Sequence, residues 1–349
     1  MFGPEARRAG LLSAGGAGIV VGLVAARFGW DSFIRADAKS FVLVASHLSG
    51  DGLDARDSAY RYGRPLYSIA GLLLAGGRQA WLPWSLPVVN CLAFGAAVSG
   101  AVELAVRHGR SMRQGLLILA VPAMWMCLAV AWSEALLIAL LLGFVLFHEE
   151  RRDVPAATCL ALAILTRETA ALVLVPFCLA ALLRRDWKGL AVRTAAGVPA
   201  VLWWSWTRIR LDVWPFLAES PSRSLAIGPP FAGIVGLLRA DDLTAIHVTG
   251  IVLVLAIALN AIRIGFRQPS SVVGGAAAIS GAFLLCVGPS VLNYPGDTMR
   301  VLSPALALLL AARIVDAHAG VPEPEPDEPT LTSPGERALR PPSVPADRG

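Results

Sequence analysis

The sequence predicts an all-helical, polytopic membrane protein. Of its 349 residues, 56% are hydrophobic and only 16% are charged, and the mean hydropathy is +0.62. Soluble domains carry more charge and fewer apolar residues than this. Uncharged runs such as residues 79–102 and 114–133 are long enough to cross a hydrocarbon core of roughly 30 Å as a helix. These observations exclude soluble dinucleotide-binding, barrel and nucleic-acid-binding folds, and they make membrane lipids the expected surroundings.

We predict about ten transmembrane helices with both termini in the cytoplasm. The basic clusters Arg151–Arg152 and Arg184–Arg185 then lie on the same side as Arg7–Arg8, as the positive-inside tendency requires. An uncleaved first span is favoured over a signal peptide because many apolar runs follow it. The surplus of Arg and Ala suggests a bacterial source, so the plasma membrane is the expected location. The expected spans cover residues 9–27, 81–105, 114–132, 134–148, 154–166, 169–184, 190–208, 243–263, 270–290 and 300–314.

Four of these spans offer only 12 to 15 uncharged positions, at residues 135–147, 154–166, 169–183 and 301–312, and none of them is long enough to cross the bilayer alone. Residues 154–166 and 169–184 would form helices separated by Arg167 and Glu168. Charged residues at that depth are tolerated only when they face a hydrated cavity or one another. The alternative is one long span over 154–183 with the charged pair buried near its middle. The short-helix arrangement is the first indication of a functional cavity.

The chain divides into a membrane domain over residues 1–315 and a tail over 316–349. Within the domain, residues 28–80 form a first external loop that contains two surface helices, one of them around Phe41–Leu48 and the other over Leu66–Ala75. The tail is rich in Pro and Glu and lacks the apolar residues needed to fold, so we expect it to be disordered and cytoplasmic.

The first external loop contains the side chains that suit an anionic headgroup. Arginine can donate two hydrogen bonds to a phosphate, and tyrosine rings can stack on sugars. The alternative is a solvated loop whose aromatic and basic side chains anchor it at the interface. The carboxylates are Asp31, Asp37, Asp51, Asp54 and Asp57, and the basic and aromatic segment is Tyr60-Arg61-Tyr62-Gly63-Arg64-Pro65-Leu66-Tyr67.

Five charged residues from later spans are expected at the same outer face. Each has a structural explanation of its own. Arg167 and Glu168 could neutralise each other at a helix end, and Asp297 and Arg300 could form a local pair three residues apart. Glu134 could favour a helix N-terminus electrostatically. The co-location of all five favours a site for substrate.

The order of these motifs resembles the GT-C superfamily of integral-membrane glycosyltransferases, specifically the bacterial mannosyltransferase-like group that uses polyprenyl-phosphate sugars. The resemblance covers roughly residues 10–315. The segments that carry it are Asp37-Ala38-Lys39-Ser40-Phe41, the Tyr60–Tyr67 stretch, Trp132-Ser133-Glu134-Ala135 with Thr166-Arg167-Glu168-Thr169, and Asp297-Thr298-Met299-Arg300.

The resemblance implies a role for each candidate residue. Asp37 is the expected catalytic base, and Asp31, within Trp30-Asp31-Ser32, is the rival for that role. Relatives commonly have Pro where this chain has Glu168. The expected donor-phosphate ligands are Arg61, Arg64, Arg167 and Arg300, and the expected substrate-binding residues are Tyr62, Tyr67, Glu134, Glu168 and Asp297.

The predicted function is inverting transfer of a sugar from a polyprenyl-phosphate donor to an acceptor hydroxyl of a glycan, lipid or protein at the outer face. We expect no cofactor and no metal, because a phosphate leaving group beside several arginines needs neither and no residue set has clear metal-ligand spacing. A weak cation site at Asp51, Asp54 and Asp57 is the alternative. Two other functions stay open: a carrier or flippase for an anionic lipid or solute, and a non-catalytic scaffold.

Overall fold

The computed structural model describes residues 2–34, 37–48, 62–215, 227–239 and 243–316, and of Asp37 it describes the backbone alone. These parts of the chain are helical and contain no β-strand; one isolated antiparallel bridge joins Ile227 and Val287. The predicted all-helical fold is therefore confirmed. The tail over 316–349 lies outside the described residues except for Asp316, and so does the cation site proposed at Asp51, Asp54 and Asp57.

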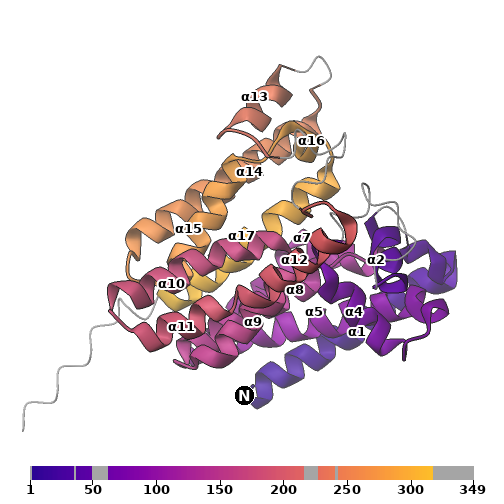
Figure 1. Ribbon diagram of the computed structural model, residues 1–349, viewed down its shortest axis with the longest axis horizontal. Helices are drawn as coiled ribbons and strands as arrows, with labels where there is room; N and C mark the ends of the chain where they lie inside the picture. Colours follow the sequence, from indigo (N-terminus) through magenta and orange to yellow (C-terminus); the bar gives the residue numbers. More distant parts are fainter. Residues whose placement is uncertain (1, 35–36, 49–61, 216–226, 240–242, 317–349) are drawn as a thin grey trace, which may run out of the picture.

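Figure 1 shows the helices of the described parts of the chain. Their bounds are α1 (Pro4–Phe28), η1 (Trp30–Phe33), α2 (Asp37–Ser46), α4 (Pro65–Leu74), η2 (Gln79–Trp81), α5 (Leu82–Arg107), α6 (Met112–Gly115), η3 (Leu116–Ala120), α7 (Pro122–Ala129), α8 (Glu134–Glu149), α9 (Asp153–Thr166), η4 (Glu168–Val173), α10 (Leu174–Leu183), α11 (Trp187–Ala195), α12 (Val198–Leu211), α13 (Ala232–Leu238), α14 (Ala245–Arg267), α15 (Val272–Leu285), α16 (Pro289–Leu292) and α17 (Pro295–Asp316).

In the described parts of the chain, four helical segments are long and apolar enough to cross a membrane. They are α1, α14, α17 and the continuous segment Gln79–Arg107, which contains α5. The bent pair formed by Met112–Ala120 and Pro122–Ala129 would give a fifth span. Each of the ten expected ranges contains helix, but several of these helices are shorter than a bilayer. The structure supports a helical membrane protein, and the number of crossings stays a prediction.

Two expected spans are interrupted. The range 114–132 bends by 57° between η3 and α7, where Pro122 begins a new helix. The range 190–208 is divided between α11 and α12, and Pro199 lies in the first turn after the break. Proline lacks a backbone N–H and is therefore tolerated in the first turn of a helix. In both places the new helix begins with a proline in its first turn.

The chain reverses at Arg167 rather than continuing through it. Arg167 has extended backbone (φ −157°, ψ 125°) between α9 and η4. Phe177, on the returning helix α10, meets Phe144 of α8 edge to face, and its carbonyl accepts a hydrogen bond from Arg193 of α11. Arg193 also pairs with Asp153 at the start of α9. The alternative of one long span over 154–183 is therefore wrong.

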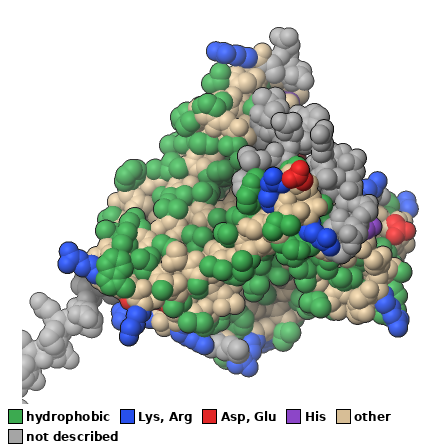
Figure 2. Space-filling model, in the orientation of Figure 1, with side chains coloured by type: hydrophobic (Ala, Val, Ile, Leu, Met, Phe, Trp, Pro, Cys, Tyr) green, Lys and Arg blue, Asp and Glu red, His purple; other side chains and the backbone are tan. Residues whose placement is uncertain are grey.

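The long helix α5 forms the centre of the packing, and α1 and α14 lie at its periphery. In the most apolar window of each helix, 83% of residues are buried in the α5 segment but only 22% in α1 and 22% in α14. The outward faces of α1 and α14 carry exposed Leu12, Leu23, Leu259 and Phe266. Water would oppose so continuous an apolar surface, whereas lipid tails would accept it. Hydrophobic side chains likewise dominate the face over α10, α14 and α15 (Figure 2).

The bundle has two chemically different ends. At one end, which we call the basic end, Arg107 at the close of α5 pairs with Glu103 and with Glu150 after α8. Glu103 also accepts a hydrogen bond of 2.7 Å from the Gly3 N–H, which brings the start of α1 to this end. The opposite end contains Glu134 at the start of α8, together with Arg167 and Arg300. We call it the cluster end.

The two helices expected in the first external loop are both present. α2 and α4 pack against each other, and Phe41 meets Tyr67 edge to face with 5.0 Å between ring centroids. The apolar face of α2, formed by Phe41, Val44 and Ala45, is buried within the protein. These helices therefore form part of the cluster end.

The close crossing of α1 and α5 depends on Gly10 of α1 and Gly95 of α5. A Cβ on Gly95 would lie 2.7 Å from both the Ala14 Cβ and the Gly10 carbonyl oxygen, whereas a Cβ on Gly16 would meet nothing within 4 Å. Small residues allow such close helix approach in membranes.

We expect Gly95→Val to force α1 away and to lower the free energy of unfolding by about 1–3 kcal/mol or more. Unfolding in mixed micelles measures the loss, with Gly16→Val as the control, and equal midpoints for the two variants would contradict this packing.

Candidate functional site

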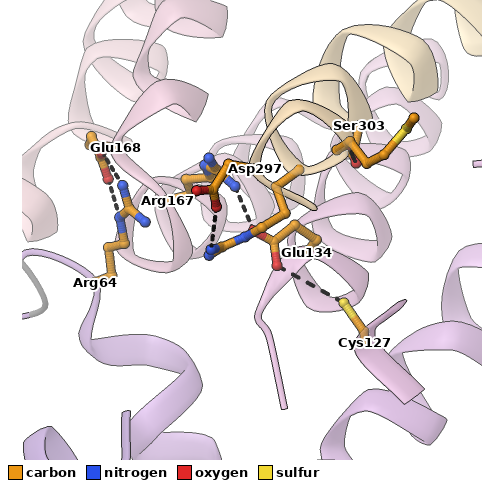
Figure 3. Close-up of polar contacts among 9 residues, drawn as sticks. Arg64, Cys127, Glu134, Arg167, Glu168, Asp297 and Ser303 are labelled. Atoms are coloured by element: carbon orange, nitrogen blue, oxygen red, sulfur yellow. Dashed lines mark hydrogen bonds and ion pairs between the residues drawn. The ribbon is translucent and has the colours of Figure 1, made fainter. Parts of the chain in front are cut away.

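Glu134 is the centre of a buried charge cluster at the cluster end. It is the first residue of α8, and its side chain is fully buried. One carboxylate oxygen, Oε1, accepts hydrogen bonds from Arg167 Nη1 at 2.5 Å and from Arg300 Nε at 2.7 Å. The other, Oε2, lies 4.0 Å from the Cys127 Sγ (Figure 3). A single carboxylate thus joins segments that lie 33 and 166 residues away in sequence.

Arg300 is held on three sides. Besides Glu134, its Nη1 donates a longer bond of 3.3 Å to Asp297 Oδ1, one turn earlier on α17. Its guanidinium carbon lies 4.5 Å from the centroid of the Trp132 ring, a cation–π contact. The Asp297 side chain is 46% exposed, so this partner reaches solvent while Glu134 does not.

A second ion pair joins the first-loop segment to the break after α9. Arg64 Nε and Nη2 donate to the two carboxylate oxygens of Glu168, each at 2.5 Å. Arg64 is buried, whereas the Glu168 side chain is 32% exposed. This fork geometry is the bidentate arrangement that arginine also forms with phosphate.

Two tryptophans of α12 hold the backbone immediately before Arg64. The indole N–H of Trp203 donates to the Tyr62 carbonyl, and that of Trp204 donates to the Gly63 carbonyl at 3.1 Å. Neither tryptophan is among the site residues predicted from the sequence. Two adjacent tryptophans in an apolar range were the available signal, because an indole N–H within a membrane needs an acceptor.

The tyrosines expected to bind substrate are packed into the protein. The Tyr62 hydroxyl donates to the His47 carbonyl, and the Tyr67 hydroxyl donates to the Leu86 carbonyl at 3.1 Å. Both side chains are fully buried. In this conformation they support α2 and α4, and sugar stacking by either ring stays a prediction.

The candidate base lies on a segment tied to the cluster. α2 begins at Asp37, whose side chain, like the whole of Arg61, lies outside the described residues. The Phe33 carbonyl, four residues before Asp37, accepts a 3.1 Å hydrogen bond from the Ala131 N–H, three residues before Glu134. The rival Asp31 is exposed in η1. The chain therefore enters α2 from beside the start of α8.

A small cavity borders the Arg167 side chain. It measures about 20 Å³ and is lined by Arg167, Thr169 and Ser280, with apolar residues of α15 and α17 around them. The Thr169 Oγ1 is buried without a hydrogen-bond partner among the described residues. A cavity of this size holds about one water molecule.

The cluster combines three guanidinium groups with three carboxylates from four separate regions of the chain. Of the expected site residues, the structure brings together Arg64, Arg167, Arg300, Glu134, Glu168 and Asp297. Within the described parts of the chain, no group of three or more His, Cys, Asp or Glu side chains could hold a metal ion. The chemistry that this arrangement suits is the binding of an anion by arginines whose carboxylate partners differ in burial.

Comparison with protein-family models, with curated proteins and with solved structures gives no match for this chain.

The charge balance at Glu134 generates a prediction about stability. Glu134→Gln leaves two buried guanidinium groups without their shared carboxylate, and we expect it to lower the free energy of unfolding by about 3–5 kcal/mol. Arg300→Met leaves Glu134 paired with Arg167, so its loss should be smaller. Denaturation in mixed micelles measures both.

The matched control is Arg208→Met, which breaks an exposed pair with Asp212. Exposed pairs contribute about 0–1 kcal/mol, so this variant should remain near the wild-type midpoint. A larger loss for Arg300→Met than for Glu134→Gln would show that Glu134 is not the shared partner that stabilises the cluster.

Proposed function

We propose that the protein is an inverting glycosyltransferase that moves a sugar from a polyprenyl-phosphate donor to an acceptor hydroxyl at the outer face of a bacterial plasma membrane. The observation that carries this proposal is the convergence of Arg64, Arg167 and Arg300 at one end of an apolar helical bundle. The motif resemblance to GT-C enzymes supports it independently.

The partners of the arginines suggest how a phosphate could enter. Glu134 is fully buried and fixes Arg167 and Arg300 from within. Asp297 and Glu168 are partly exposed, and each occupies a guanidinium edge that could instead donate to a phosphate oxygen. Phosphate binding would then require these two carboxylates to rotate away while Glu134 keeps its place.

An apolar pocket lies next to the cluster and suits the lipid part of such a donor. It measures about 210 Å³ and is formed by the first turns of α14 and α17, with Thr298 and Met299 among its lining residues. These two residues lie between Asp297 and Arg300 in the same helical turn. A chain of isoprenoid units in this pocket would bring its phosphate to Arg300.

In the proposed reaction, Asp37 accepts the proton of the acceptor hydroxyl as its oxygen attacks the anomeric carbon. The bond between that carbon and the phosphate oxygen breaks, and polyprenyl phosphate departs with the bonding electrons. Inversion follows from attack on the face opposite the leaving group. Preorganised arginines would stabilise the charge that develops on the phosphate, so the leaving group needs no general acid.

A transfer assay tests the function. Proteoliposomes are incubated with radiolabelled polyprenyl-phosphate mannose, arabinose or glucose and with extracted envelope acceptors. We expect label in the acceptor, and a loss of about 100-fold or more in Asp37→Asn because a base is removed. Asp31→Asn should be milder. Movement of labelled lipid between leaflets without transfer would instead identify a carrier. The absence of both transfer and lipid movement would identify a scaffold.

The phosphate assignment predicts a graded effect at Arg64. Arg64→Lys keeps the charge but loses the two-pronged donor, and Arg64→Ala loses both, so donor affinity should fall in the order wild type, Lys, Ala. Arg300 should show the same order. Binding of labelled polyprenyl phosphate to purified protein measures this directly.

Arg208→Ala serves as the control because Arg208 lies in the last turn of α12 and forms an exposed ion pair with Asp212. It should bind the donor like the wild type. Equal binding by wild type, Arg64→Ala and Arg300→Ala would show that these arginines serve packing alone.

A further inference from the structure

An apolar groove lies between α10, α14 and α15, helices that Figure 1 labels. Its volume is about 500 Å³, within the range of ligand pockets. Leu179 and Leu183 of α10, Ile262 and Phe266 of α14, and Ala278 and Ile279 of α15 line its walls.

The mouth of the groove is at the basic end and is polar. It is formed by Arg184, which follows α10, and by Ser270 and Ser271, which precede α15. The Ser271 hydroxyl caps α15 by accepting a hydrogen bond from the Gly274 N–H, so the N-terminus of this 14-residue helix lies beside Arg184. A helix N-terminus, a guanidinium group and hydroxyl groups all favour an anion.

Basic residues outnumber acidic ones in the segments that form the groove. Arg263 and Arg267 lie on the last turns of α14, which also forms the groove. In residues 175–195 and 262–282 the single acidic residue is Asp186. Its carboxylate is already engaged, because it accepts the Gly189 N–H at 2.9 Å and caps α11. No carboxylate of these two segments forms an ion pair with Arg184.

Exposed aromatic side chains mark this end as one that meets headgroups. Trp187 is 66% exposed and Phe266 is 83% exposed. Aromatic rings at the ends of apolar helices are typical of the boundary between lipid tails and headgroups. A second groove of about 350 Å³ lies between α9, α11 and α12. None of its lining residues, which include Val154 and Pro199, is charged. Of these two grooves, the one beside Arg184 combines an apolar trough with a cationic mouth.

We propose that this groove binds an anionic glycerophospholipid, with one acyl chain between α10, α14 and α15 and the phosphate at Arg184, Ser270 and Ser271. The site is at the opposite end of the bundle from Glu134. It is therefore separate from the proposed sugar-transfer site and does not depend on that function.

Native mass spectrometry of the purified full-length chain tests the proposal. Phosphatidylglycerol and phosphatidylcholine with identical acyl chains are titrated in parallel, and the dissociation constant of the tightest site is measured for each. We expect the wild type to prefer phosphatidylglycerol and Arg184→Ala to lose about fivefold of that affinity, as expected for one arginine near a headgroup. Arg185→Ala is the matched control, because Arg185 is adjacent and basic but does not line the groove.

A second variant separates the acyl chain from the charge. Ala282 lines the groove and is exposed, so Ala282→Trp can fill the trough without entering the core. We expect it to weaken both lipids while its unfolding midpoint stays near that of the wild type. Equal affinity for the two lipids in the wild type, or equal losses in Arg184→Ala and Arg185→Ala, would overturn the proposal.

Discussion

The burial of one carboxylate between two guanidinium groups is the constraint on which the cluster end depends. Glu134 is fully enclosed in an apolar bundle, where an unpaired charge would be costly. Arg167 can reach it only if the chain breaks after Thr166, and Arg300 can reach it only if α17 begins at this end. The requirement for charge pairing therefore fixes how α8, α9 and α17 meet.

This constraint also separates fixed from exchangeable partners. Glu134, shared by Arg167 and Arg300, is fully buried, whereas Asp297 beside Arg300 and Glu168 beside Arg64 are partly exposed. An arrangement of this kind keeps cations organised within a membrane before any ligand arrives. It is the property that the proposed phosphate chemistry needs, since preorganised charge stabilises a leaving group without rearrangement.

The sequence predicted most helical ranges, the break at Arg167 and the gathering of charges at one end, because apolar periodicity and short spans are local signals, but it missed the breaks within 114–132 and 190–208. Local spacing also favoured the pair of Asp297 with Arg300, which the structure contains. The sequence did not predict the long-range pairs. Local spacing favoured Arg167 with Glu168, yet Arg167 pairs with Glu134 and Glu168 pairs with Arg64. Such pairings depend on which helix ends meet, which neighbouring residues do not encode. The burial of Tyr62 and Tyr67 follows in the same way from contacts with His47 and Leu86.

The most direct test of the central claim is whether the sign of a Glu134 substitution depends on its two arginines. Unfolding midpoints in mixed micelles are compared for Glu134→Leu in the wild type and in an Arg167→Met, Arg300→Met double variant. If Glu134 is the shared partner, leucine destabilises the wild type but is neutral or stabilising in the double variant, because it removes a buried charge that has lost both partners. The same loss in both backgrounds would contradict the account.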